Sequence, residues 1–124
     1  MEKETKDDML ERLFEKQIIL QKRLGNYPLT DMKQRQTFIN IMMLAALDEM
    51  TEAMRETCWK NPNYVVHGWK QTQKFDEVKF KEEIVDLWHF VINLSLAAGF
   101  DAKSLFEGYC DKNAINHKRQ DNNY

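Results

Sequence analysis

The segment 76–99, DEVKFKEEIVDLWHFVINLSLAAG, decides the fold of this chain. It opens with an aspartate, a residue that can cap a helix, and it closes with a glycine, which is typical of the position after a helix. Between them, side chains of one face recur at intervals of three and four residues, the period of a helix with a buried side. These side chains are Phe80, Ile84, Leu87, Trp88, Val91 and Ser95. The pattern predicts a helix over residues 76–98.

Three further helices are predicted around this segment, at about 7–24, 31–58 and 101–117. The first is followed by Gly25 and Pro28, and the stretch 59–75 lacks periodicity and contains Pro62, so it is predicted to be a loop. The helix at 31–58 has an expected core stripe of Ile39, Met42, Met43, Ala46, Met50 and Ala53. We therefore expect a single all-α domain over residues 1–124, a bundle of four to five helices.

Composition excludes several classes of protein. Of 124 residues, 43% are hydrophobic and 31% are charged, as in a soluble globular protein rather than a disordered one. The net charge of −2 gives no global attraction to nucleic acid or to a membrane surface. No run approaches the roughly 18 apolar residues of a membrane span. Cys58 and Cys110 follow no secretory signal, so we expect free thiols and a cytoplasmic protein that binds neither nucleic acid nor membrane.

Paired carboxylates on two helices carry the chemistry. Glu49 and Glu52 share one helix face, and Glu49 falls within the apolar stripe, where an unpaired charge is costly. Glu83 and Asp86 repeat the arrangement on the helix at 76–98. A Glu-x-x-Glu pair alone is most often a solvated face. Two inward pairs on adjacent helices indicate a site for Mg²⁺ or Mn²⁺, which prefer oxygen ligands.

Polar residues elsewhere are candidates for binding a ligand. Gln17 and Gln21 lie within the apolar stripe of the first helix, where buried amides need partners. Trp59 can stack on a base, or it can cover the edge of the core. In the last helix, one face carries Lys112, Asn116 and Arg119. That face is either a phosphate clamp or a basic helix end favoured by the helix dipole.

These motifs resemble the dimeric all-α dUTPase family, related to MazG-like nucleotide pyrophosphatases and to phage dCTP/dUTP pyrophosphatases. The resemblance lies in Gln17-x-x-Leu20, in Glu49-x-x-Glu52, in EIVDLWHF at 83–90, and in Lys112-Asn113-x-x-Asn116-x-x-Arg119-Gln120. It implies the MazG-like all-α NTP pyrophosphatase fold and a homodimer with helices shared across the interface. It also implies that the tail reaches the triphosphate and that two or three metal ions are held by Glu49, Glu52, Glu83 and Asp86.

The activity expected from this resemblance is Mg²⁺-dependent hydrolysis of dUTP to dUMP and pyrophosphate. No Ser, Cys or Lys is placed to be a nucleophile, so metal-activated water is expected to attack, oriented or deprotonated by Glu49. Asn93 lies about 10 Å along the helix from Asp86, a suitable offset from phosphate to base. The expected substrate-binding residues are Gln17, Gln21, Trp59, Lys60, His89, Asn93, Lys112, Asn116, Arg119 and Gln120.

Alternatives to this activity remain. An amide side chain can flip to suit cytosine or uracil, so dCTP or a broader range of deoxynucleoside triphosphates is also compatible with these residues. From other classes, the chain could be a helical interaction module without enzymatic activity, or a small nucleic-acid binder that uses its basic tail.

Self-association is expected on physical grounds as well. The helices at 31–58 and 76–98 carry more apolar side chains than one thin core can cover. These include Phe38, Met42, Met43, Trp88, Val91 and Ile92. A two-fold symmetric dimer that buries roughly 2,000 Å² along these helices is therefore predicted.

Overall fold

The computed structural model describes residues 9–59 and 74–123 and contains four helices. They are α1 (Met9–Arg23), α2 (Met32–Arg55), α3 (Glu77–Ala97) and α4 (Ala102–Asp121). No strand occurs within the described ranges, which confirms the all-α prediction.

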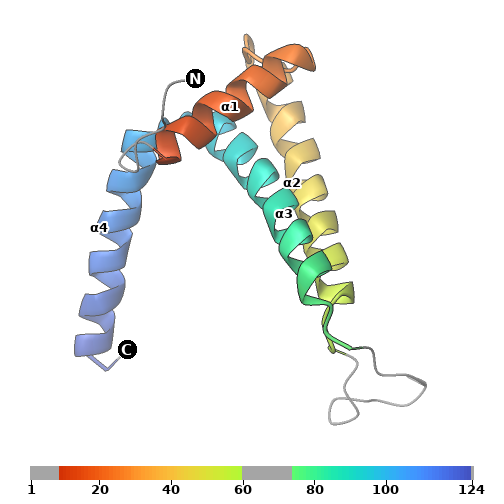
Figure 1. The fold of residues 1–124 in the computed structure, drawn as a ribbon. Helices are drawn as coiled ribbons and strands as arrows, with labels where there is room; N and C mark the ends of the chain where they lie inside the picture. Colours follow the sequence, from red (N-terminus) through yellow and green to blue (C-terminus); the bar gives the residue numbers. More distant parts are fainter. Residues whose placement is uncertain (1–8, 60–73, 124) are drawn as a thin grey trace.

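Helices α2 and α3 form the centre of the fold, where they run antiparallel and side by side over most of their length (Figure 1). Helix α1 crosses their upper end and packs on α3. Helix α4 turns away from α3, packs on α1, and projects from the other three helices (Figure 1). The site predicted on α2 and α3 therefore lies on the most extensively packed pair.

Local sequence signals set the helix boundaries. Asp31, Asp76 and Asp101 are N-caps, and each accepts a hydrogen bond from the backbone N–H three residues ahead. Gly25 and Gly99 follow α1 and α3 with φ of +80° and +98°. Because side chains disfavour this left-handed region, glycine is the suitable residue at both stops.

Two predicted boundaries were wrong. Helix α2 ends at Arg55 rather than near Cys58, because the N–H groups of Glu56 and Thr57 bond the carbonyls three residues back, of Ala53 and Met54, and so leave the α-helical ladder. Helix α4 continues past His117 to Asp121, since its exposed polar residues are compatible with a solvated helix. The predicted start of the first helix and most of the predicted loop lie outside the described residues.

The hydrophobic core of the described chain is small. It consists of Phe14, Phe38, Ala46, Ala53, Ile92 and Ala97. Four residues predicted to be core are instead exposed, namely Met43, Met50, Trp88 and Val91. The reason is geometric, since α2 and α3 cover each other on one side only and leave the rest of each apolar arc bare. Phe38 and Ile92, which were assigned to a dimer surface, are buried within this chain.

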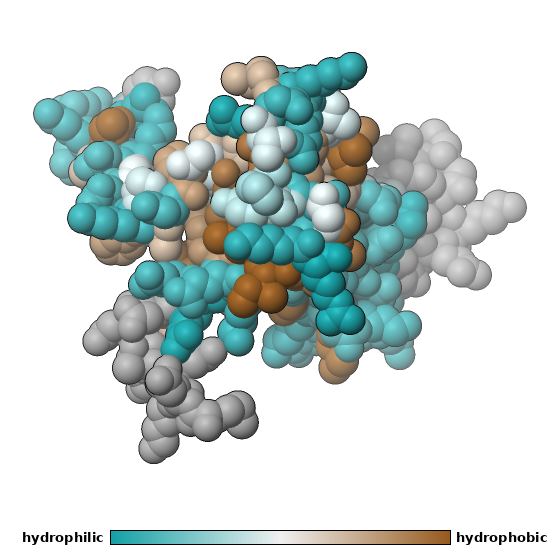
Figure 2. All heavy atoms as spheres, turned by 90° about the horizontal axis from the view of Figure 1, so that it is seen from above, coloured by the Kyte–Doolittle hydropathy of each residue, from teal (hydrophilic) through white to brown (hydrophobic). Residues whose placement is uncertain are grey.

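The exposed apolar side chains are numerous on α2 and α3. Those more than half exposed on these helices include Ile41, Met43, Leu44, Leu47, Met50, Val85 and Trp88. In the view from above, apolar atoms gather near the middle of the molecule between hydrophilic ones (Figure 2). A monomer of this size seldom exposes so much apolar surface, which is consistent with the predicted self-association.

Two further sequence predictions concern the thiols and the membrane. Cys58 and Cys110 are both free and exposed. Within residues 9–59 and 74–123, no single helix has the length and apolar composition of a membrane span, although α3 and α4 reach both as a pair bent by 97°.

One long-range hydrogen bond joins the first turn of α2 to the end of α3. Arg35 Nε donates to the carbonyl oxygen of Ala97, in the last turn of α3, at 2.7 Å. A cation here also interacts favourably with the negative end of the helix dipole. We expect Arg35→Ala to lower the free energy of unfolding by about 1–2 kcal/mol in urea titrations. Lys33→Ala, an exposed change on the same helix, should leave it nearly unchanged, and equal losses would contradict this role of Arg35.

Candidate active site

Three carboxylates from α2 and α3 meet in the centre of the helix pair. Glu49 lies on α2, Glu83 and Asp86 lie on α3, and one oxygen from each lies within 4.8 Å of the others. Glu49 is half-buried because its neighbours along the face, Ala46 and Ala53, are packed against α3. We call these three residues the carboxylate cluster.

Burial within the cluster is costly for charged groups. Glu49 Oε2 and Glu83 Oε2 are both buried, and neither has a hydrogen-bond partner among the described residues. Burial raises the pKa of Glu49 to about 7, with further contributions from Glu83, which can share a proton with it, and from the charges of Glu52 and Asp86. Glu83 likewise raises the pKa of Glu52, chiefly through a shared proton.

The cluster has the properties of a site for a hard divalent cation. All its donors are carboxylate oxygens, two of them are buried without a partner, and the nearby carboxylates repel one another. A bound Mg²⁺ or Mn²⁺ would satisfy the orphan oxygens and cancel the repulsion. Glu52, the fourth predicted ligand, stands beside Glu83 but outside the group of three.

A cavity of about 380 Å³ adjoins the cluster. Helix α1 contributes one wall, and α2 and α3 contribute the others. The residues that line it are Gln17, Leu20, Gln21, Leu24, Glu49, Asp86, His89, Phe90 and Asn93. The fold thus brings four of the predicted substrate-binding residues to the same cavity as two predicted metal ligands.

The amides of this cavity are buried and paired. Gln17, Gln21 and Asn93 are only 4%, 5% and 2% exposed. Gln17 Nε2 donates to Asn93 Oδ1 at 2.7 Å, which joins α1 to α3. Asn26 Nδ2 donates to Gln21 Oε1 at 3.0 Å. Gln17 and Gln21 lie in an apolar stripe, where buried amides need hydrogen-bond partners, and each of them has an amide partner.

The neighbouring histidine and leucines complete the cavity. His89 Nδ1 lies 3.1 Å from the carbonyl oxygen of Val85, so this nitrogen carries a proton and Nε2 is left as the acceptor of the neutral ring. Leu20, Leu24 and Phe90 supply apolar surface. Such a mixture of flat apolar walls and a few amides suits a planar heterocycle.

The predicted tail residues lie elsewhere. Lys112, Asn116, Arg119 and Gln120 are exposed on α4 and do not line the cavity. In Figure 1 the C-terminal half of α4 stands apart from α2 and α3, the two helices that carry the cluster. Trp59 is half-buried just beyond α2, and Lys60 lies outside the described residues.

Sequence reasoning missed one residue that lines this cavity and two that hydrogen-bond its amides. Leu24 lines the cavity but was treated only as the end of a helix, and Asn26, which bonds Gln21, lies between the Gly25 and Pro28 that were treated only as a helix stop. Met42 was assigned to the core, yet its sulfur accepts a hydrogen bond from Asn93 Nδ2 at 3.3 Å. No sequence pattern identifies such an amide–thioether contact, since its two residues lie 51 positions apart.

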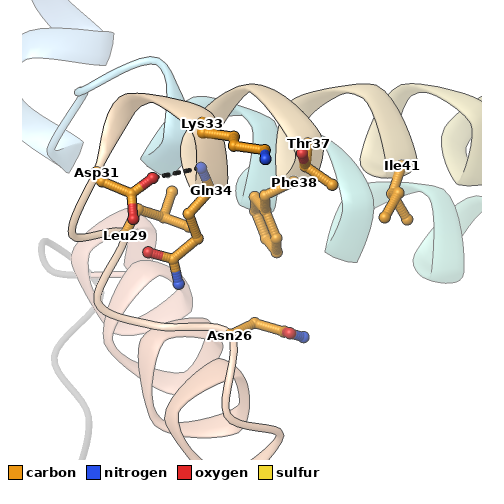
Figure 3. Close-up of a pocket in the computed structure, with 8 residues that line it drawn as sticks. All are labelled: Asn26, Leu29, Asp31, Lys33, Gln34, Thr37, Phe38 and Ile41. Atoms are coloured by element: carbon orange, nitrogen blue, oxygen red, sulfur yellow. Dashed lines mark hydrogen bonds between the residues drawn. The ribbon is translucent and has the colours of Figure 1, made fainter.

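A second cavity of about 380 Å³ lies at the start of α2 and contains none of the predicted site residues. Its lining consists of Asn26, Leu29, Asp31, Lys33, Gln34, Thr37, Phe38 and Ile41 (Figure 3). Asp31 is engaged there as the N-cap, with its carboxylate accepting the N–H of Gln34 at 2.7 Å (Figure 3). This cavity lacks the carboxylate cluster and is not the candidate active site.

The fold and the cluster define an all-α protein with paired carboxylates facing each other across two helices. A family model described as dUTPase matches residues 9–99, and the chain belongs to this all-α dUTPase family. The matched range contains the carboxylate cluster and the amides of the cavity, and it ends before α4.

Individual relatives come from bacteriophages. The chain is 34% identical over 89 residues to the dCTP pyrophosphatase of Enterobacteria phage T4, covering 66% of this chain and 52% of that protein. It is 41% identical over 49 residues to the dCTP pyrophosphatase of Enterobacteria phage LZ5, covering 40% and 28%. A phage T4 DNA replication protein is 31% identical over 78 residues, covering 57% and 20%. The chain thus spans about half the length of the first relative, and no solved structure matches it.

The cluster should make the stability of the metal-free protein depend on pH. The folded pKa of Glu49, about 7, lies above its ordinary value of 4.5, so the folded state binds this proton more tightly than the unfolded state. Its contribution to stability is therefore complete below pH 4.5 and is lost as the pH rises to 7. In EDTA, we expect the melting temperature to fall over this range, and Glu49→Gln to reduce the fall.

The control for this measurement is Glu82→Gln, an exposed carboxylate on α3 that should keep the wild-type pH dependence. Addition of millimolar Mg²⁺ should raise the wild-type melting temperature most at pH 7 and above, where the ligands are ionised. An identical pH dependence of the melting temperature in wild type and Glu49→Gln would contradict the raised pKa of Glu49.

Proposed function

We propose that this protein is a Mg²⁺-dependent pyrophosphatase that hydrolyses a pyrimidine deoxynucleoside triphosphate, dUTP or dCTP, to the monophosphate and pyrophosphate. The observation that carries the proposal is the carboxylate cluster beside a cavity walled by buried amides. Anionic phosphates need cations, and a planar base needs flat apolar walls with a few hydrogen-bonding groups. The carboxylate cluster suits the cations, and the adjoining cavity offers the apolar walls and the amides.

The chemistry assigned to the chain's own residues is limited. Glu49, Glu52, Glu83 and Asp86 would hold the ions, two or three in number. Bound Mg²⁺ supplies charge neutralisation of the triphosphate and activation of a water. Water oxygen bonds to the α-phosphorus as the bond from that phosphorus to the bridging oxygen breaks, and pyrophosphate leaves. Glu49, the carboxylate most enclosed by core residues, orients this water or takes its proton.

Base recognition is assigned to the amides. Gln17, Gln21 and Asn93 can hydrogen-bond the polar edge of a pyrimidine, and Phe90 can pack against its face. The dUTPase family supports uracil, whereas the names of two phage relatives support cytosine. A phosphate-release assay over all deoxynucleoside triphosphates, with inorganic pyrophosphatase added, decides between them and also tests for a broader range.

The tail is proposed to act across a homodimer. Lys112, Asn116 and Arg119 are cations and an amide on one exposed side of α4, remote from the cluster of their own chain. A second copy, held by the exposed apolar surfaces of α2 and α3, can bring its α4 to this cluster. The opposite charges of the tail and the cluster favour that approach.

The metal ligands give the first activity test. We expect Glu83→Gln to lower kcat at least 100-fold, because it removes a buried ligand oxygen and a charge that neutralises the cation. The adjacent Glu82→Gln is the matched control, since it makes the same chemical change on an exposed side chain. Glu49→Gln, Glu52→Gln and Asp86→Asn should resemble Glu83→Gln. Near-normal turnover in two of the four ligand variants would disprove the proposed site.

Mixed dimers test the position of the tail. Arg119→Ala should impair triphosphate turnover strongly and weaken monophosphate binding much less, while Lys118→Ala serves as the neighbouring control. When inactive Glu83→Gln and Arg119→Ala proteins are mixed, a tail that acts across the interface leaves one site of the heterodimer with both wild-type groups. We therefore expect activity to return on mixing.

The result that contradicts this arrangement is equally clear. If the tail acts within its own chain, both sites of the mixed dimer remain defective and no activity returns. Light scattering on the same samples checks the assembly, and a fully active species of monomer mass would refute the homodimer itself.

A further inference from the structure

Three amides, Gln17, Gln21 and Asn93, line the cavity beside the carboxylate cluster, and they take part in two amide–amide hydrogen bonds. In one, Gln17 Nε2 donates to Asn93 Oδ1, and in the other, Asn26 Nδ2 donates to Gln21 Oε1. A primary amide carries its acceptor and its donor on the same planar group, so a half-turn exchanges them. Which edge of a base such a pair accepts therefore depends on what holds the amide in one orientation.

Met42 holds one of these pairs. Asn93 Nδ2 donates to Met42 Sδ at 3.3 Å. A thioether sulfur accepts hydrogen bonds and cannot donate one. A half-turn of Asn93 would set its carbonyl oxygen against the sulfur, so that two acceptors faced each other. Asn93 is only 2% exposed, which leaves little access for water to relieve that contact.

The orientation of Gln17 follows from that of Asn93. With Asn93 Oδ1 turned toward α1, Gln17 must present its Nε2 to make the 2.7 Å bond. Gln17 Oε1 has no partner among the described residues, so it remains available to a ligand. Met42 Sδ on α2 only accepts hydrogen bonds. It thus sets the order of donors and acceptors in the Gln17–Asn93 pair, which joins α1 to α3.

The second pair has no such constraint. Asn26 is exposed, and the reverse bond, from Gln21 Nε2 to Asn26 Oδ1, would be equivalent. Gln21 and Asn26 can therefore turn together to suit either a donor or an acceptor. Any discrimination between bases must come from the Gln17–Asn93 pair.

We propose that Met42 is a positioning residue that fixes the Gln17–Asn93 pair and so restricts the cavity to one of the two pyrimidine bases. This inference rests on the proposed function. Cytosine and uracil carry opposite donor–acceptor orders at the ring nitrogen and at C4. A fixed pair satisfies one order and leaves buried groups unpaired against the other, which is an effective way to reject a substrate. Met42 is not among the lining residues, so it acts through Asn93.

The test is Met42→Leu, which keeps the apolar volume and removes the acceptor. The wild-type protein should prefer one of dCTP and dUTP. In the variant, the ratio of the two kcat/KM values should move toward one by roughly fivefold, the scale of one lost hydrogen bond. The change should appear mainly in the disfavoured substrate. A merely structural role of Met42 would lower both values together and leave their ratio unchanged.

Met43→Leu is the matched control, because it makes the same substitution at the next residue, which is exposed, whereas Asn93 bonds Met42. Its ratio should equal that of the wild type. A wild-type protein that accepts both bases equally, or an unchanged ratio in Met42→Leu, overturns the inference without affecting the proposed activity.

A ligand-free measurement separates the two proposals further. If the wild-type protein hydrolyses no deoxynucleoside triphosphate, the proposed function fails. The positioning by Met42 is then read from the side-chain amide of Asn93 in ¹⁵N-labelled protein by NMR. One sharp pair of signals in the wild type that broadens or doubles in Met42→Leu, and not in Met43→Leu, supports the inference. Identical signals in all three proteins refute it.

Discussion

The packing of α2 against α3 forces like charges together, and the candidate site depends on this constraint. Glu49 and Glu83 each keep one buried oxygen without a partner among the described residues, and burial with neighbouring carboxylates raises the pKa of Glu49 to about 7. A metal-free protein of this design carries a destabilising cluster at neutral pH. Under the proposed function, a divalent cation held by these carboxylates would relieve that repulsion and offset the lost stability.

The rest of the fold is arranged around this strained pair. Three aspartate caps and two glycine stops define the helix boundaries, and Arg35 bonds the last turn of α3, away from the cluster. The core itself is too small to tolerate much strain alone. Association of two copies through the bare apolar arcs of α2 and α3 would supply the missing burial, which gives the proposed homodimer a thermodynamic reason as well as a catalytic one.

The sequence predicted the parts of this structure that local patterns govern. Helical periodicity located all four helices, and the spacing of Glu49, Glu83 and Asp86 placed them on facing surfaces that the fold brings within 4.8 Å. It failed where tertiary context decides. The exposure of Met50 and Trp88 depends on how few helices cover them, and the role of Met42 depends on a contact between residues far apart in the chain. Periodicity shows that a helix has an apolar face, but it does not show which neighbour covers that face.

The division of labour among the helices limits how the site can work. Helices α2 and α3 supply negative charge, α1 and α3 supply the amides, and the basic residues of α4 lie apart from both within one chain. The pKa of Glu49 is raised by burial and by neighbouring carboxylates. A triphosphate brought to such a cluster would add further negative charge. Under the proposed function, cations that offset this charge would come first from metal ions at the cluster and then from the tail of a second copy. Neither the metal ions nor the tail alone can neutralise both the cluster and the phosphates. We therefore expect substrate binding to couple metal binding to formation of the dimer.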